Sequence, residues 1–133
     1  MKPVVQEHPM GCAVACVASL CGISYKSALR RFKKPEHAWG RGYYCREICA
    51  ALGKENFMYA YFPKSVFAKR GVRIPVGTIV FIARSKKHVY GHFLLKTPRG
   101  WMNSWVNEPV MTPVKAAFER RLPGRAQWII YEK

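Results

Sequence analysis

The chain has 133 residues and a formal net charge of +16, from 23 Lys and Arg residues against 7 acidic ones. Half of the residues are hydrophobic and 14% are aromatic, which excludes a disordered chain and predicts a single domain, residues 1–133, with one sizeable core. All seven acidic residues are Glu, so neither a catalytic triad nor a magnesium site can use an Asp. The positive charge favours anionic partners.

The predicted helices span residues 11–21, 25–32 and 43–52, with a loop over residues 33–42. The first is apolar almost all round, which indicates burial on several sides. Ser24 is a typical N-cap for the second helix, and Gly22 and Gly53 stop the first and the third. The apolar run of residues 11–23 is too short to span a membrane, which needs about 20 residues, and its flanks do not suit a signal peptide.

The second half of the chain has the composition of strands, rich in aromatic and β-branched residues. The predicted strands span residues 57–62, 78–84, 91–97, 101–106 and 127–131. Residues 98–100, Pro-Arg-Gly, predict a tight connection between the third and fourth strands, and a short helix is expected over residues 114–121. Helices followed by antiparallel strands indicate an α+β fold.

The five cysteines are Cys12, Cys16, Cys21, Cys45 and Cys49. Because the count is odd, at least one thiol cannot pair within the chain. Several lie in apolar, helix-like surroundings, where a free cysteine behaves as a small hydrophobe. We therefore expect a reduced, cytoplasmic protein rather than a secreted disulfide scaffold.

Cys12 stands at the start of the first predicted helix. The unpaired N–H groups and the dipole of a helix N-terminus favour a thiolate, which is the nucleophilic form of cysteine. The other four cysteines are expected to be core residues.

Gln6 precedes Cys12 by six residues, and its amide can donate to the oxyanion of a tetrahedral intermediate together with the backbone N–H of Cys12. A preorganised donor of this kind contributes about 3 kcal/mol to transition-state stabilisation.

The four histidines are His8, His37, His88 and His92. Only His92 opens a predicted strand, which makes it the candidate base. If residues 98–99 form the hairpin turn, Leu94 lies opposite Asn103, and Asn103 lies one diagonal step from His92 on the same side of the sheet, about 7–8 Å between backbones. Asn103 can then orient the imidazole while the second ring nitrogen serves the thiol. Asn107 has the same parity and stays an alternative.

Three segments resemble one family. Residues 6–16, Gln-Glu-His-Pro-Met-Gly-Cys-Ala-Val-Ala-Cys, resemble the start of the bacteriocin-processing double-glycine peptidases, a papain-like family. Residues 91–95, Gly-His-Phe-Leu-Leu, are similar to the strand that carries their histidine. Residues 103–105, Asn-Ser-Trp, stand where that family usually has Asp-Pro and where papain-type enzymes have Asn-Ser-Trp. The resemblance implies a papain-like cysteine peptidase fold, with N-terminal helices packed on a C-terminal antiparallel sheet.

The resemblance also implies a bacterial or phage cysteine peptidase. In it Cys12 attacks a peptide carbonyl and His92 carries the proton. Asn103 orients His92, and Gln6 holds the oxyanion. No cofactor is required, and the partner is a peptide or protein substrate, for which the charge favours an acidic one. The apolar residues expected to roof the reacting pair or line a cleft are Trp101, Trp105, Tyr43 and Tyr44. The chain has no membrane span and no nucleotide-binding motif, so the leader specificity of peptide-exporting transporters is not carried over.

Three alternatives stay open. A nucleic-acid-binding module is indicated by basic clusters at residues 30–34, 69–73, 84–87 and 120–121, although they are spread along the chain. A zinc site could form if the Cys12/Cys16 and Cys45/Cys49 pairs met around one ion. The third alternative is a papain-like fold that binds without catalysing. The oligomeric state is not determined by the sequence.

Overall fold

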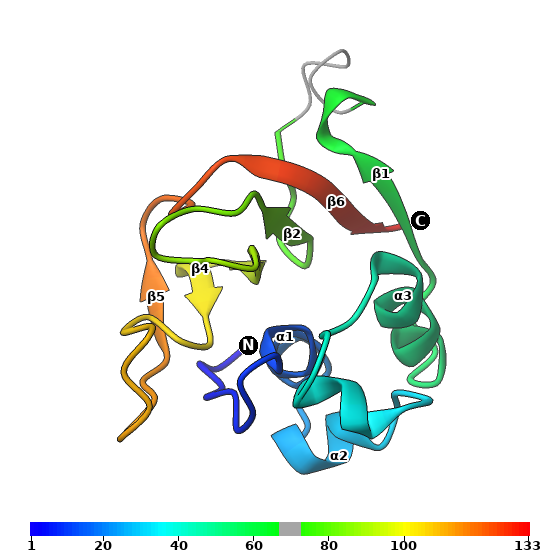
Figure 1. Cartoon of the computed structure of the whole chain (residues 1–133). Helices are drawn as coiled ribbons and strands as arrows, with labels where there is room; N and C mark the ends of the chain where they lie inside the picture. Colours follow the sequence, from blue (N-terminus) through cyan, green and yellow to red (C-terminus); the bar gives the residue numbers. More distant parts are fainter. Residues whose placement is uncertain (67–72) are drawn as a thin grey trace.

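The computed structural model describes residues 1–66 and 73–133 of the chain. The elements are α1 (Cys12–Cys21), α2 (Tyr25–Leu29), the 3-10 helix η1 (Pro35–Ala38), α3 (Cys45–Gly53), β1 (Tyr59–Pro63), β2 (Ile79–Ile82), β3 (His92–Thr97), β4 (Gly100–Asn103), β5 (Ala117–Glu119) and β6 (Ala126–Glu132) (Figure 1). No helix within the described ranges is long and apolar enough to cross a membrane. Of the basic cluster at residues 69–73, residues 69–72 lie outside the described residues.

The six strands form one antiparallel sheet in the order β1-β6-β2-β3-β4-β5. The helices come first in the chain and form a layer against this sheet, with α1 packed on β3 and α3 packed on β1 (Figure 1). The predicted α+β architecture, with N-terminal helices on a C-terminal antiparallel sheet, is confirmed. β3 is a central strand of the sheet, and it packs against α1, the helix with the most buried residues.

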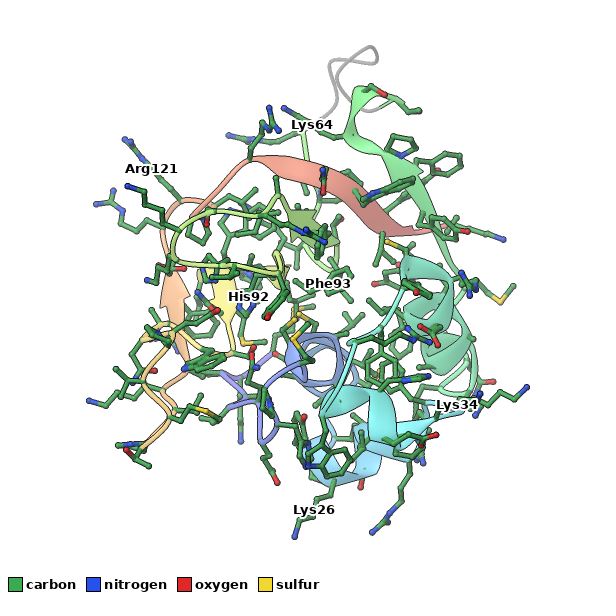
Figure 2. The ribbon with its side chains drawn as sticks, viewed as in Figure 1. Lys26, Lys34, Lys64, His92, Phe93 and Arg121 are labelled. Carbon is green, nitrogen blue, oxygen red and sulfur yellow. The ribbon has the colours of Figure 1, made fainter. Side chains whose placement is uncertain are left out.

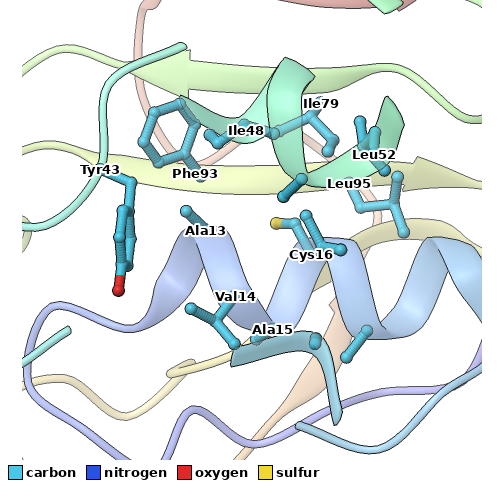
Figure 3. Packing of buried hydrophobic residues seen from close by; sticks show 14 of the residues in the cluster. Ala13, Val14, Ala15, Cys16, Tyr43, Ile48, Leu52, Ile79, Phe93 and Leu95 are labelled. Carbon is cyan, nitrogen blue, oxygen red and sulfur yellow. The ribbon is translucent and has the colours of Figure 1, made fainter. Parts of the chain in front are cut away.

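The main core lies between the helices and one face of the sheet. In Figure 3, Ala13 and Cys16 of α1 face Phe93 and Leu95 of β3, while α3 contributes Ile48. Successive residues of a strand point to opposite faces, so the alternate residues of the central strands pack on the other side. That second, smaller cluster consists of Val80, Ile82, Leu94, Trp101 and Ile129. Both faces of the central strands are therefore buried, which holds β3 rigidly in place.

The helix expected over residues 114–121 is wrong: residues Ala117–Glu119 form β5, which pairs with β4. Pairing with β4 satisfies backbone groups of residues 101–103 and leaves the short β5 as the edge strand, and this pairing outweighs the local helix preference. The fourth predicted strand is shorter than expected and ends at Asn103, where the chain turns. The third helix begins at Cys45 rather than at residue 43.

Candidate active site

Cys12 is the first residue of α1, as the sequence predicts. The residue before it, Gly11, is the N-cap and offers no side chain to the first helical turn. A Cβ at position 11 would lie 2.0 Å from the hydroxyl oxygen of Tyr25, so the close approach of α2 requires glycine there. Cys12 is half-buried and packs against the core cluster that contains Phe93. The thiol thus lies where α1 meets β3.

The prediction that the helix N-terminus lowers the pKa of Cys12 is wrong in its net direction. Burial raises the pKa of the thiol to about 11, and the negative charge of Glu108 acts in the same direction. The backbone N–H groups of Phe93 and Ala13 lower the pKa, as expected at a helix start, but they do not outweigh the loss of hydration. At neutral pH the resting thiol is therefore protonated.

His92 and Asn103 meet as the hairpin geometry predicts. Strands β3 and β4 pair with Leu95 opposite Met102, which is the register that places Leu94 opposite Asn103. The Nε2 atom of His92 lies 2.7 Å from Oδ1 of Asn103, and both side chains are buried. The alternative orienter, Asn107, is engaged in its own loop, where it donates to the carbonyl of Pro113.

The hydrogen bonds of Asn103 determine the tautomer of His92. Nδ2 of Asn103 donates to Oε2 of Glu119 over 2.8 Å, so Oδ1 must face the imidazole. Oδ1 also accepts from the backbone N–H of Trp105 over 3.0 Å. Because Oδ1 can only accept, His92 carries its proton on Nε2 when neutral. This leaves the lone pair on Nδ1, which is the arrangement that a general base requires.

His92 is neutral at physiological pH. Burial lowers its pKa to about 4, and the neighbouring His88 acts in the same direction, while the hydrogen bond to Asn103 raises it. Within residues 1–66 and 73–133, no hydrogen bond joins His92 to the thiol of Cys12. The two groups are nevertheless held by neighbouring elements, since His92 and Phe93 begin the strand that packs against α1 (Figure 2). The resting pair is thus a neutral thiol beside a neutral imidazole.

Gln6 is buried and links the loop before α1 to the end of β4. Its Oε1 accepts from the hydroxyl of Ser104 over 2.8 Å. Its Nε2 donates to the carbonyl oxygens of His8 and Pro9 over 3.0 and 3.1 Å. Both amide hydrogens therefore have acceptors in the resting protein. A role in binding an oxyanion requires one of these two bonds to be released, and this role stays a prediction.

Two acidic residues belong to the polar network that sequence reasoning missed. Glu119 accepts from Asn103, and Glu108 lies 2.8 Å from Nδ1 of His88. The ring of His88 is fully buried and stacks on that of His92, with centroids 4.6 Å apart and planes 9° apart. Two of the chain's seven carboxylates thus bind the direct neighbours of His92, namely Asn103 and His88, and this placement is the signal. It becomes visible only when the strands are paired, because both residues are distant from His92 in sequence.

The structure does not bring the cysteine pairs together around an ion. In the part of the chain that the structure describes, one group of three residues could hold a metal: His88, His92 and Glu108, whose ligand atoms lie within 4.8 Å of one another. The two imidazole rings are almost parallel, so the lone pairs in their planes do not converge on one point. We assign no metal to this group, and all five cysteines are free thiols.

A hollow of about 280 Å³ adjoins the start of β3. Tyr43, Tyr44 and Phe93 contribute to its wall, as the sequence predicted for the two tyrosines. The expectation is wrong for Trp101, which is buried in the second core cluster. Trp105 lines a separate hollow together with Gln6, and its indole N–H donates to the carbonyl of Val110. The hollow beside β3 is lined mainly by aromatic carbon and therefore suits an apolar side chain.

Comparison with solved structures supports the architecture. The chain is similar to the peptidase domain of Streptococcus ComA, a bi-functional ABC transporter involved in a quorum-sensing pathway, with a TM-score of 0.60 and 17% sequence identity. The match covers 98% of this chain and 96% of that chain. The fold is that of a papain-like peptidase domain. At this identity the likeness establishes the fold alone, and no protein-family model or curated protein matches the sequence.

Proposed function

We propose that the chain is a cysteine peptidase in which Cys12 is the nucleophile, His92 the general base and Asn103 the orienting residue. The observation that carries the proposal is the 2.7 Å contact between Nε2 of His92 and Oδ1 of Asn103. It leaves Nδ1 as the basic nitrogen at the start of β3, the strand against which the nucleophile's helix packs. The fold shared with a peptidase domain supports the same reaction class.

The reaction begins from neutral groups. As Sγ of Cys12 attacks the carbonyl carbon of a peptide bond, its proton passes to Nδ1 of His92, and a C–S bond forms. The negative charge that develops on the carbonyl oxygen is stabilised by the backbone N–H of Cys12, with Gln6 as the second donor once it releases one of its carbonyl acceptors. Asn103 and Glu119 hold the imidazolium in place during this step.

The tetrahedral intermediate collapses when the C–N bond breaks and Nδ1 of His92 returns its proton to the leaving amine. Water then attacks the thioester, and His92 accepts one proton from that water. The C–S bond breaks, the proton returns to the sulfur of Cys12, and the acid product leaves. All proton transfers use residues of this chain, and no cofactor takes part in them.

The test is turnover of a peptide library, detected by mass spectrometry of new termini. The Cys12→Ala variant is expected to have no turnover, and His92→Ala is expected to lose a factor of about 10² to 10⁴ in kcat because the general base is gone. Cys21→Ser is the matched control, since Cys21 lies at the opposite end of the same helix and is also half-buried. Full activity of Cys12→Ala would refute the proposal.

A binding domain with the same fold is the second candidate, and one observation favours it. The thiol of Cys12 is protonated at rest and makes no hydrogen bond to His92 within the described residues. If the wild type and Cys12→Ala both lack turnover across the library yet bind the same peptides equally well, this candidate replaces the peptidase.

A further inference from the structure

The helical layer contains a basic hollow of about 750 Å³, on the side of α3 away from the sheet core. The positively charged residues of its wall are Arg31, Lys33, Lys34, Arg41, Arg46 and Lys54. Arg46 lies in α3 and Lys54 directly follows it, while the other four lie in the segments before and after η1, so the fold gathers them from separate stretches. We call this feature the basic hollow.

Most of the charge in the basic hollow is uncompensated. Glu47 pairs with Arg41 over 2.9 Å, and Glu55 pairs with Arg31. Within the described part of the chain, the remaining four cations form no ion pair; they are Lys33, Lys34, Arg46 and Lys54, and all four are exposed. Like charges around one concavity repel one another, and a concave wall concentrates their field. An anionic ligand would relieve this repulsion.

The basic hollow adjoins the aromatic hollow described above. Arg46 lines both, and the aromatic hollow reaches Phe93, which follows His92 in β3. A ligand that occupies both hollows would therefore extend along α3 from Phe93, the chain neighbour of His92. An extended polypeptide can place an apolar side chain in one hollow and carboxylates in the other.

We propose that the basic hollow binds an acidic segment of the polypeptide substrate, and this inference rests on the proposed peptidase function. The aromatic hollow beside it favours a polypeptide, because one extended chain can place an apolar side chain there and carboxylates in the basic hollow. Tyr44 is exposed, but guanidinium groups of Arg41 and Arg46 lie 4.2 and 4.8 Å from its ring centroid. These cations already contact the ring of Tyr44 and would compete with a base that stacks on it. Of the other aromatic residues of the aromatic hollow, Tyr43 and Phe93 are buried, while Tyr61 and Trp128 are exposed.

The experiment measures binding of a fluorescein-labelled octaglutamate peptide by anisotropy, in the Cys12→Ala background so that no turnover interferes. The test variant carries Lys34→Glu and Lys54→Glu. The matched control carries Lys64→Glu and Lys115→Glu, which changes the net charge equally at exposed positions that do not line the hollow. Figure 2 shows Lys34 beside the helices and Lys64 beyond the strands. Circular dichroism checks that both variants fold.

We expect the test variant to lose affinity about tenfold or more and the control to change little. Equal losses in both variants would overturn the inference, because they would show attraction to net charge alone. An oligothymidylate of equal charge is titrated in parallel, and binding tighter than octaglutamate that is also lost in the test variant would overturn it in favour of a nucleic acid.

Failure of the basic hollow and failure of the peptidase proposal give different results in these experiments. Loss of octaglutamate binding in the test variant, combined with no turnover by the wild-type chain, would leave the basic hollow as a binding site and refute the peptidase. Turnover that persists while octaglutamate binding is unaffected by Lys34→Glu and Lys54→Glu would refute the basic hollow alone.

Discussion

At the scale of single residues, the candidate site differs from a simple triad because a carboxylate stands behind its amide. Asn103 by itself could present either its oxygen or its nitrogen to His92. Glu119 and the backbone N–H of Trp105 together remove this ambiguity, since the carboxylate accepts only from Nδ2 and the N–H donates only to Oδ1. An Asp in the place of Asn103 would put a negative charge directly beside His92. Here the negative charge is that of Glu119, which lies one hydrogen bond farther from the imidazole. This makes Glu119 a positioning residue.

The role of Glu119 leads to a prediction. In Glu119→Ala the Asn103 amide loses its acceptor and keeps only the hydrogen bond from the backbone N–H of Trp105, so the proton on Nε2 of His92 is less strongly enforced. We expect kcat to fall about 10- to 100-fold, with little change in KM, because a lost hydrogen bond to a charged group corresponds to about 1.5–3 kcal/mol. Glu119→Gln keeps an acceptor and should restore most of kcat. If steady-state kinetics give the same kcat for Glu119→Ala and the wild type, Glu119 has no positioning role.

The lowered pKa of His92 predicts a pH-dependent stability. The pKa of about 4 in the folded protein lies below the ordinary value of 6.5, so the unfolded chain binds a proton at a pH where the folded one does not. Stability from this residue is complete above pH 6.5 and decreases as the pH falls toward 4, by at most about 3 kcal/mol. Urea unfolding between these pH values should show the decrease. In His92→Gln the slope should be smaller, and an unchanged slope would contradict the assignment.

At the scale of secondary-structure elements, the start of β3 depends on Gly91. Its φ is +76°, and a Cβ there would lie 2.2 Å from Cζ of Phe81 and 2.8 Å from the carbonyl oxygen of Ile82. Because β2 approaches so closely, the backbone that presents His92 can take this path only with glycine. The loop from β2 to β3 also contains the buried His88, whose carbonyl accepts from the N–H of Gly91.

Gly91→Ala should therefore lower the free energy of unfolding by about 1–3 kcal/mol, the range for overpacking and backbone strain. It should also lower kcat, because His92 would move relative to Asn103. Gly40→Ala is the matched control: its φ is not positive and nothing lies within 4 Å of the added Cβ. Chemical denaturation of both variants measures the difference, and equal stability would show that β2 can shift without cost.

At the scale of the whole molecule, charge is distributed unevenly. Of the 23 Lys and Arg residues, two form ion pairs with carboxylates within the described ranges, Arg31 with Glu55 and Arg41 with Glu47. Two more of the seven carboxylates, Glu108 and Glu119, serve the polar network around His92. The rest of the surface carries an excess of positive charge that opposes the compact state.

This excess predicts that added salt stabilises the folded protein. Raising the ionic strength from about 0.01 to 0.15 M shortens the screening length from about 30 to 8 Å, which weakens repulsion between the exposed cations. The melting temperature at neutral pH should therefore rise with sodium chloride, and the Lys34→Glu, Lys54→Glu variant should show a smaller rise. A melting temperature that is independent of salt would mean that the positive charges do not interact.

The sequence by itself determined that helices precede an antiparallel sheet, that Cys12 stands at a helix start and that Asn103 is the favoured partner of His92, with Asn107 as the alternative. These features follow from local periodicity and from the register of one hairpin, which a tight turn sets. The strand at residues 117–119 could not be predicted, because its reason for forming is a pairing partner on β4. The same pairing brings Glu119 to Asn103.

The tertiary structure alone decided the protonation states. The helix N-terminus favours a thiolate at Cys12, but the packing of α1 on β3 removes water from the thiol and raises its pKa to about 11. Likewise, the burial of His92 beside His88 lowers its pKa to about 4. Hydration depends on every element that surrounds a group, so no local pattern in the sequence reports it.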